Sequence, residues 1–307
     1  MLVLVRPDLP VEELGALPPA LELVALDGPP TPGQLARAEV VVPAYGSEIV
    51  ARLGEMPALR LVLVSSAGYE WLTPHLPEGV AHANARGARD SAVAEWVLAA
   101  VLAMEKDLPG FSDAQRAERW AHRLVSDLAG RTALILGAGS IGGAVAERLG
   151  PFGVEVIRVA RTPRAGVHGA VELPALLPRA DVLVVLLPET PDTRGMVGAG
   201  VLGRLPEGAL VVNAGRGTVV DTEALLDAVR SRGLRAALDV TDPEPLPPGH
   251  PLWRAPGVLI TPHVAGDTPR AERAALRLAG DQLRAYAAGA PVPNVIGGGG
   301  SGLARRS

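Results

Sequence analysis

The segment 132–150 constrains the fold more than any other part of this 307-residue chain. A short apolar run, 132–136, leads into the glycine turn Gly137-Ala-Gly-Ser-Ile-Gly142, and apolar residues then recur every four positions from Ile141 to Leu149. An apolar run followed by helical spacing predicts a buried strand, a tight turn and a helix. The segment therefore predicts one strand-turn-helix unit of a parallel α/β sheet.

Each glycine of the turn meets a different structural requirement. Gly137 allows the tight turn, Gly139 lets backbone N–H groups approach a pyrophosphate, and Gly142 lets the helix pack closely on the strand. The helix N-terminus offers unpaired N–H donors and the positive end of its dipole to phosphate. We therefore predict a dinucleotide site that includes these glycines with Ser140 and Ile141. The alternative is a tight strand-to-helix turn that binds nothing.

Composition excludes several classes of function. A net charge of −4 gives no basic field for nucleic acid or an anionic membrane, so we expect neither partner. The chain has no cysteine, which removes disulfides, thiolate ligands and cysteine nucleophiles, and we expect no metal site. Polar residues follow Met1–Val5, and no apolar run approaches the roughly 18 residues of a membrane span. We expect no signal peptide and, by default, a cytoplasmic location.

Length and a hydrophobic content of 48% predict two packed domains. Short apolar runs separated by turns or helical patterns predict a parallel sheet covered by helices in each domain. In the first part of the chain they lie at Leu2–Val5, Leu21–Ala25, Glu39–Val42, Leu61–Val64 and Val80–Ala83. In the second part they lie at Thr132–Leu136, Val154–Val159, Asp181–Leu187, Ala209–Val212, Arg235–Asp239 and Gly257–Ile260, the six strands of a doubly wound dinucleotide domain.

Two helices set the expected domain limits. Residues 91–103 are apolar on nearly every face, which predicts a helix buried on all sides that joins the domains. The last helix, at about 269–288, is expected to return to the first domain. We therefore expect residues 1–98 with 270–296 to form one domain and residues 99–269 the dinucleotide domain. The glycine-rich stretch 297–307 predicts a flexible tail.

Unusual residues follow several predicted strands at their carboxyl ends, where open α/β sheets bind ligands. Arg216 stands between two glycines, Glu244 between two prolines, and His263 in the turn Thr261-Pro-His-Val-Ala-Gly266. Together they predict an anion clamp with a tuned acid/base. Ala67 and Gly68 follow an earlier strand and are candidate anion-binding amides, although an ordinary loop explains them equally well.

The ordered motifs carry a family resemblance. Gly137-Ala-Gly-Ser-Ile-Gly, Leu187-Pro188 with Thr193, Asn213-Ala-Gly-Arg-Gly, Glu244-Pro-Leu-Pro and Thr261-Pro-His263 together resemble the D-isomer-specific 2-hydroxyacid dehydrogenases. The resemblance covers the chain from about Ser65 to the last helix. It implies a Rossmann domain inserted into a flavodoxin-like substrate domain, both doubly wound.

The resemblance also implies roles for individual residues. Arg216 would bind a 2-oxo acid and polarise its carbonyl, His263 would exchange the proton, and Glu244 would orient His263 and favour its charged form. Ala67 and Gly68 would bind the substrate carboxylate. The implied cofactor residues are Leu187, Pro188, Thr193, Ala214, Asp239 and Gly266, with the Asp239 carboxylate on the nicotinamide amide.

The end of the second strand of the dinucleotide domain predicts the cofactor. An NAD enzyme places an acidic residue about 20 residues past the glycine turn, but here the position is Ala160, followed by Arg161, Thr162 and, after a proline, Arg164. Two guanidinium groups and a hydroxyl suit a 2′-phosphate, so we predict NADP over NAD. The alternative is exposed arginines without a ligand.

Two departures from the family pattern bear on the substrate. Leu186 stands where many members have histidine, which resembles the glyoxylate and hydroxypyruvate reductase branch, whereas Thr241 replaces an aromatic residue. The sequence thus predicts reduction of a small 2-oxo acid. The other hypothesis is a dinucleotide-sensing regulatory protein on the same fold. The polar segment 105–127 and the resemblance predict a homodimer.

Overall fold

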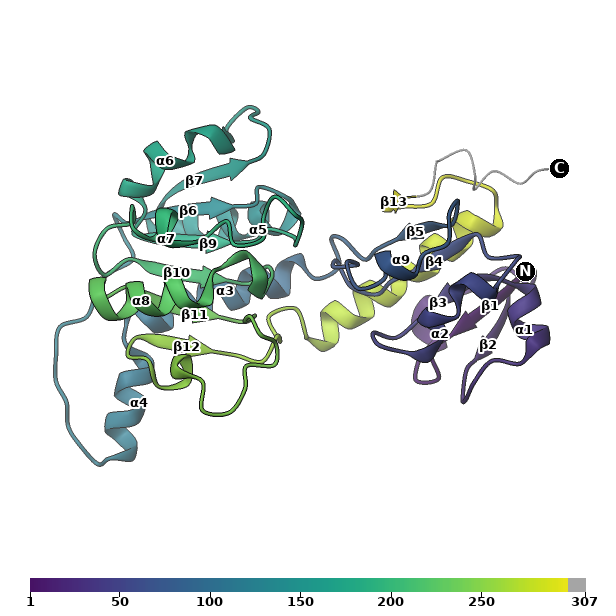
Figure 1. The fold of residues 1–307 in the computed structure, drawn as a ribbon, viewed down its shortest axis with the longest axis horizontal. Helices are drawn as coiled ribbons and strands as arrows, with labels where there is room; N and C mark the ends of the chain where they lie inside the picture. Colours follow the sequence, from purple (N-terminus) through teal and green to yellow (C-terminus); the bar gives the residue numbers. More distant parts are fainter. Residues whose placement is uncertain (298–307) are drawn as a thin grey trace. The chain divides into compact units, whose positions relative to one another are not determined.

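The computed structural model describes residues 1–297, which form two compact units (Figure 1). Unit 1 comprises residues 1–89 and the segment from Thr268 onward, and unit 2 comprises residues 90–267. Both are parallel α/β units, which confirms the predicted fold class. The predicted tail lies outside the described residues except for Gly297. For Gly297 the prediction is wrong, because its backbone pairs with strand β5 beside His82.

Unit 1 contains a sheet in the order β13-β5-β4-β3-β1-β2. Its parallel strands confirm the five predicted runs, whereas the edge strand β13 is antiparallel and was not predicted. The strands are β1 (Leu2–Val5), β2 (Glu22–Ala25), β3 (Ala38–Val42), β4 (Leu61–Leu63), β5 (Ala81–Ala83) and β13 (Val295–Gly297).

Helices cover both faces of the unit 1 sheet. The long helix α9 (Pro269–Ala287) buries Leu276, Ala279 and Leu283 against one face, and α1 (Pro32–Arg37) and α2 (Glu48–Ala51) cover the other. The Thr268 side chain caps α9 by accepting a hydrogen bond from the Ala271 N–H (3.1 Å). The helix therefore begins at Pro269, as predicted.

Unit 2 contains a parallel sheet in the order β12-β11-β10-β9-β6-β7-β8. This is the Rossmann order with one further strand, and all six predicted strands are present. The short strand β8 was missed because two residues carry no periodicity. The strands are β6 (Thr132–Leu136), β7 (Glu155–Ala160), β8 (His168–Gly169), β9 (Val182–Val185), β10 (Leu210–Asn213), β11 (Arg235–Leu238) and β12 (Val258–Ile260).

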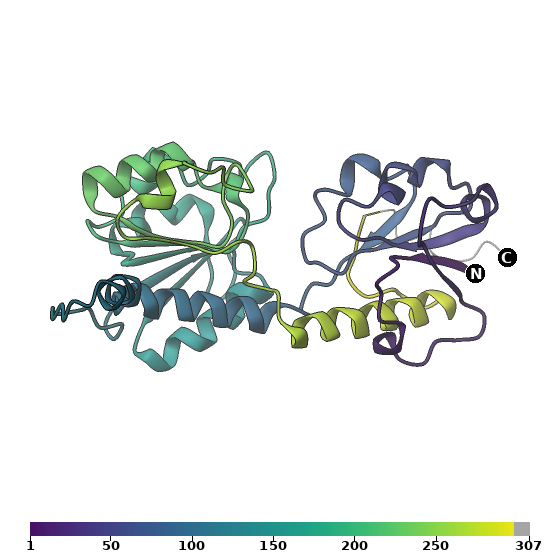
Figure 2. The ribbon, with the colours of Figure 1, turned by 90° about the horizontal axis from the view of Figure 1, so that it is seen from below.

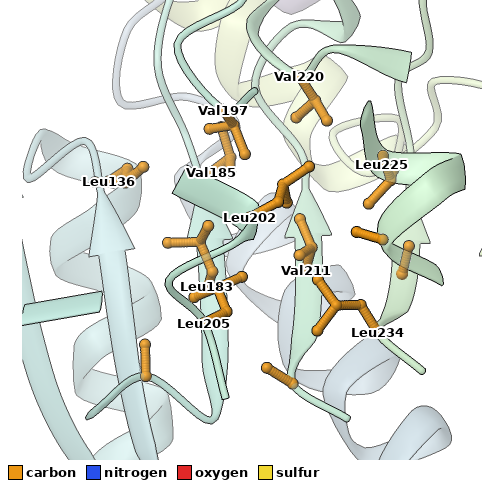
Figure 3. Packing of buried hydrophobic residues seen from close by; sticks show 14 of the residues in the cluster. Leu136, Leu183, Val185, Val197, Leu202, Leu205, Val211, Val220, Leu225 and Leu234 are labelled. Carbon is orange, nitrogen blue, oxygen red and sulfur yellow. The ribbon is translucent and has the colours of Figure 1, made fainter. Parts of the chain in front are cut away.

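Each face of the unit 2 sheet has its own helices (Figure 2). Helices α3 (Asp90–Glu105) and α5 (Ser140–Leu149) pack on one face, and α6 (Leu173–Leu176), α7 (Ala199–Leu202) and α8 (Thr222–Arg232) on the other. Figure 3 shows the core between the sheet and the second group of helices, where Leu183, Val185 and Val211 meet side chains from α7 and α8. Helix α4 (Leu108–Arg116) follows α3.

Helix α3 differs from the prediction in its burial. Glu95 and Ala99, one turn apart, are exposed, so the helix is not buried on all sides. It lies wholly in unit 2, and its Val97 and Val101 pack in the core beneath the sheet. The exposed positions are thus a glutamate and an alanine, and alanine is a good helix former whether or not it is buried.

Short 3-10 segments complete the described chain. They lie at Val11–Leu14, Leu53–Glu55, Thr73–His75, Gly150–Phe152, Ala170–Glu172, Leu177–Arg179, Gly217–Val219 and Pro251–Arg254. Within residues 1–297, no helix combines the length and the apolar character that a membrane crossing requires.

Candidate active site

The glycine turn lies at the point in unit 2 where the strand order reverses, between β6 and β9. Gly137 has a φ of +108°, and a Cβ there would lie 2.7 Å from the Leu186 carbonyl oxygen. A Cβ at Gly142 would lie 2.1 Å from the Gly137 carbonyl oxygen. Close packing of the turn on its neighbours therefore requires both glycines, for the reasons that the sequence suggested.

The N-terminus of α5 fits a dinucleotide pyrophosphate. Gly139 is the N-cap and provides no side-chain cap, so the first N–H groups of the helix are available to a ligand. A Cβ at Gly139 would meet no atom within 4 Å among the described residues, which shows that the space beside the turn is open. Ser140 is exposed at the same place.

The end of β7 brings cationic groups to this turn. The strand ends at Ala160, and Arg161 and Thr162 follow it with exposed side chains. The Arg164 guanidinium donates to the carbonyl of Ala138, which lies inside the glycine turn. One of the two predicted arginines is therefore held against the dinucleotide turn, and no carboxylate stands at the strand end. The donors present fit a phosphate at the 2′ position.

The Arg216 loop is held by Asn213, the last residue of β10. The Asn213 amide donates from Nδ2 to the Arg216 carbonyl (3.0 Å), and its Oδ1 accepts from the Gly215 N–H (3.1 Å). A Cβ at Gly215 would lie 2.7 Å from the Leu187 carbonyl oxygen, and one at Gly217 only 1.8 Å from that of Thr241. Both glycines that flank the arginine are therefore required by close backbone contacts.

Asp239 organises the turn that carries His263. Its carboxylate is buried, 3% exposed, and accepts from the Thr261 hydroxyl (2.6 Å) and from the N–H groups of Val264 (2.9 Å) and Ala265 (2.8 Å). The His263 N–H donates to the Asp239 carbonyl (2.8 Å). Sequence reasoning missed this structural role, for which the only signal is an aspartate at a strand end.

His263 and Glu244 form a close pair. The Nδ1 atom of His263 lies 2.6 Å from Oε1 of Glu244, and their side chains are 51% and 42% exposed. Because Nδ1 faces the carboxylate, it carries the proton, and Nε2 is the ring nitrogen left for another group. His263 adopts a φ of +56°, an uncommon conformation that the surrounding hydrogen bonds maintain.

Further predicted residues follow other strands at this edge of unit 2. The Thr193 hydroxyl donates to the Pro188 carbonyl (2.6 Å) and closes the loop that follows β9. The Ala214 N–H donates to the Val185 carbonyl (3.2 Å), which places it directly after β10. Leu187 lies just beyond β9, and Gly266 lies later in the turn that follows β12. Among residues 1–297, no group of three or more His, Cys, Asp or Glu residues could hold a metal ion.

Ala67 and Gly68 lie in unit 1, in the loop that follows β4. The Ser66 carbonyl accepts from the Ala85 N–H (2.9 Å), and the Ala67 carbonyl accepts from Nδ2 of Asn84 (2.6 Å). The Ser66 hydroxyl donates to the Gly68 carbonyl (2.5 Å). The loop is thus fixed by its carbonyl groups, at the carboxyl edge of the unit 1 sheet.

Known proteins resemble the chain in sequence. The chain is 32% identical over 264 residues to the glyoxylate reductase of Aeropyrum pernix, covering 80% of this chain and 78% of that protein. It is 31% identical over 313 residues to the D-3-phosphoglycerate dehydrogenase of Mycobacterium tuberculosis, covering 97% of this chain but only 59% of that longer protein.

Solved structures resemble it over nearly its whole length. The D-isomer specific 2-hydroxyacid dehydrogenase of Xanthobacter autotrophicus, in complex with NADPH and MES, is 34% identical with a TM-score of 0.82, covering 96% of this chain and 97% of that one. An NADPH-dependent glyoxylate/hydroxypyruvate reductase of Sinorhizobium meliloti, in complex with NADP and sulfate, is 28% identical with a TM-score of 0.82, covering 98% and 99%.

The family itself follows from a match to more than half of the chain. Residues 98–265 match the model of the NAD binding domain of D-isomer specific 2-hydroxyacid dehydrogenases. The match contains the glycine turn and the Arg216, Glu244 and His263 loops described above. The chain belongs to the D-isomer specific 2-hydroxyacid dehydrogenase family and is, by that membership, an NAD(P)-dependent oxidoreductase.

Proposed function

We propose that the protein reduces a small 2-oxo acid, of the glyoxylate or hydroxypyruvate kind, to the corresponding D-2-hydroxy acid with NADPH. The observation that carries this proposal is the 2.6 Å contact of His263 with Glu244, on the same sheet edge as Arg216 and the glycine turn. A carboxylate-supported imidazole can exchange a proton at the substrate oxygen. The two similar structures, which are complexes with NADPH and with NADP, support the cofactor.

The proposed reaction adds a hydride and a proton across the carbonyl of the acid. The bound nicotinamide supplies the hydride. Arg216 binds the acid and draws electron density onto its carbonyl oxygen, and Nε2 of His263 gives that oxygen a proton. Glu244 holds the opposite nitrogen and stabilises the imidazolium. In the oxidative direction, the neutral His263 takes the proton back.

We propose a separate binding role for each of the two units. The unit that contains Arg216 is the dinucleotide-binding domain, and the unit that contains Ala67 and Gly68 is the substrate-binding domain. We propose that Asp239 also binds the nicotinamide amide. Its Oδ2 atom accepts one hydrogen bond, from the Ala265 N–H, and therefore has a lone pair left for that amide.

The function is tested by following the loss of nicotinamide absorbance with a panel of 2-oxo acids. We expect turnover of glyoxylate or hydroxypyruvate. The regulatory hypothesis instead requires dinucleotide binding, measured by calorimetry, without turnover of any acid. Binding without turnover would therefore replace the proposed function by that alternative.

The preference for NADPH is tested at the arginines after β7. We expect kcat/KM to be at least about tenfold higher with NADPH than with NADH, because a 2′-phosphate makes charge-assisted hydrogen bonds. The variants R161A and R164A should each reduce this ratio, and the exposed Arg254 provides the control substitution R254A. Equal efficiencies in the wild type would contradict the proposal.

We also propose a homodimer formed through the segment 105–127 of unit 2. Trp120 and Leu124 are 98% and 94% exposed there, and burial of such side chains is favourable. Light scattering at micromolar concentration should give the dimer mass, and W120E with L124E should give the monomer. The control V171E changes an apolar residue outside this segment that is 88% exposed. A cytoplasmic location remains part of the proposal, testable by cell fractionation.

A further inference from the structure

The loop that follows β4 in unit 1 has two successive peptide groups anchored on the same side. The Ser66 carbonyl accepts from the Ala85 N–H (2.9 Å), and the Ala67 carbonyl accepts from Nδ2 of Asn84 (2.6 Å). Both donors belong to the residues that directly follow β5. The loop is therefore attached to the neighbouring strand end through its carbonyl groups.

Because a peptide bond is planar, the direction of these carbonyl groups determines the direction of the N–H groups on the other side of the loop. In a trans peptide the N–H points opposite to the carbonyl of the same group. The N–H groups of Ala67 and Gly68 therefore both point away from β5, and within the described chain neither donates to a protein acceptor. Successive N–H groups on one side of a loop form a concave site for an anion.

Asn84 is built to hold one of these peptides. It is only 5% exposed, its Oδ1 accepts from the Arg86 N–H (3.2 Å), and its own carbonyl accepts from Nε2 of Gln282 (3.0 Å). Its amide orientation is determined by its partners, because a carbonyl faces Nδ2 and an N–H faces Oδ1. A buried side chain that is fixed on both sides cannot rotate away from Ala67.

We infer that Asn84 is a positioning residue for the substrate carboxylate. By holding the Ala67 carbonyl, it turns the Gly68 N–H toward the carboxylate of the 2-oxo acid, beside the Ala67 N–H. The inference rests on the proposed function, in which these two amides bind the acid. It adds a residue that does not itself touch the substrate.

The substitution N84D tests the inference. Asp keeps the acceptor for Arg86 but places an oxygen against the Ala67 carbonyl, so the Ala67–Gly68 peptide should rotate, which a crystal structure of the variant would show. The KM for glyoxylate should rise by about 10- to 100-fold, the effect of losing a hydrogen bond to a charged group. Because carboxylate binding is common to ground and transition states, kcat should change by less than about threefold.

Two further variants make the result decisive. N84A removes the same donor without adding a charge, and it replaces N84D if the latter does not fold. N294G is the matched control, since the Asn294 side chain donates to the carbonyls of Asn84 (3.3 Å) and Arg86 (2.9 Å) rather than to that of Ala67. Glycine accepts the φ of +59° at this position. N294G should leave the KM for glyoxylate within about twofold.

The two readouts separate the inference from the proposed function. A rotated peptide together with a raised KM supports the inference. An unrotated peptide, or a rotated peptide with an unchanged KM, overturns it. If the wild type reduces no 2-oxo acid, the proposed function fails, and the crystal structure of N84D still decides whether Asn84 determines the direction of the two amides.

Discussion

Unit 1 and unit 2 present their proposed substrate-binding groups in opposite ways. Unit 2 uses charged side chains, Arg216, Glu244 and His263, which come from three different loops. Unit 1 uses two backbone N–H groups, those of Ala67 and Gly68, in the loop that follows β4. The sequence identifies a charged side chain by its type, whereas it identifies these two amides only by their position after a strand and does not give the direction of their N–H groups.

Both units nevertheless hold their loops with the same device, a buried asparagine at a strand end. In Asn84 and Asn213, Oδ1 accepts from the N–H two residues further on, and Nδ2 donates to a loop carbonyl. Such an asparagine mimics a backbone turn. The difference is that Asn213 holds its own loop, whereas Asn84 holds a loop 17 residues away.

The largest expected effect on activity tests the role of the charged side chains in unit 2. H263A removes the proton donor and should reduce kcat by on the order of 10² to 10⁴ in a steady-state assay. H250A is the matched control, since His250 accepts from the Leu252 N–H (3.2 Å) and only caps a short 3-10 segment. A near-normal kcat in H263A would show that His263 is not the acid/base.

R216A should have the next largest effect. Arg216 is expected to contact the acid before and during hydride transfer, so KM should rise and kcat should fall together, reducing kcat/KM by roughly 10² or more. This distinguishes the side chain of unit 2 from the amides of unit 1, whose loss should change KM alone. A pure KM effect in R216A would show that the two units contribute in the same way.

E244Q should lower kcat by a smaller factor than H263A or R216A. Glutamine retains a hydrogen bond to Nδ1 of His263, 2.6 Å from the carboxylate in the wild type, but it loses the negative charge beside the ring. The kcat for reduction should therefore fall, with little change in KM for the acid. An unchanged kcat in a steady-state assay would contradict an electrostatic role for Glu244.

The smallest effect concerns the stability of unit 1. His82 lies in β5, 7% exposed, and burial lowers its pKa below 6.5, with no hydrogen-bond partner for either ring nitrogen within residues 1–297. The folded state therefore favours the neutral ring. The neutral ring therefore contributes to the free energy of unfolding in full above about pH 6.5. As the pH falls from that value toward the lowered pKa, this contribution is lost by up to about 1.4 kcal/mol per pH unit.

H82L tests this prediction by thermal or urea unfolding at pH 8 and pH 5. At pH 8 the two proteins should differ only in packing, because the ring is neutral in both the folded and the unfolded state. Between pH 8 and pH 5, H82L should lose less stability than the wild type. Equal losses would show that the burial of His82 does not contribute to the loss of stability at low pH.

The sequence predicts the framework of both units well. Alternation of strands and helices predicts both sheets, and β7 ends at Ala160, where the prediction places the ribose contact. It could not predict β8 and β13, which are two and three residues long and too short to show a periodic pattern. Strand β13 also depends on pairing with β5, which lies far away in the sequence.

The parts of the site that sequence reasoning missed are polar groups acting on backbone. Asp239 was predicted from the resemblance as a cofactor ligand, but its three hydrogen bonds to the turn around His263 depend on residues 22 to 26 positions away. Asn84 carried no signal, because a single asparagine after a strand is common in loops. Such roles require the three-dimensional arrangement of carbonyl and N–H groups.

The contact of Gly217 with Thr241 limits how this enzyme could be redesigned. With the Thr241 carbonyl so close, any side chain at position 217 would displace the segment that leads to Glu244. The Thr222 hydroxyl, which donates to the Asp242 carbonyl (2.6 Å), joins the same two regions. Combinatorial libraries should therefore vary residues 218–222 and 241–243 together, with Gly215, Arg216, Gly217 and Glu244 retained, because a change in either loop alters the contact with the other.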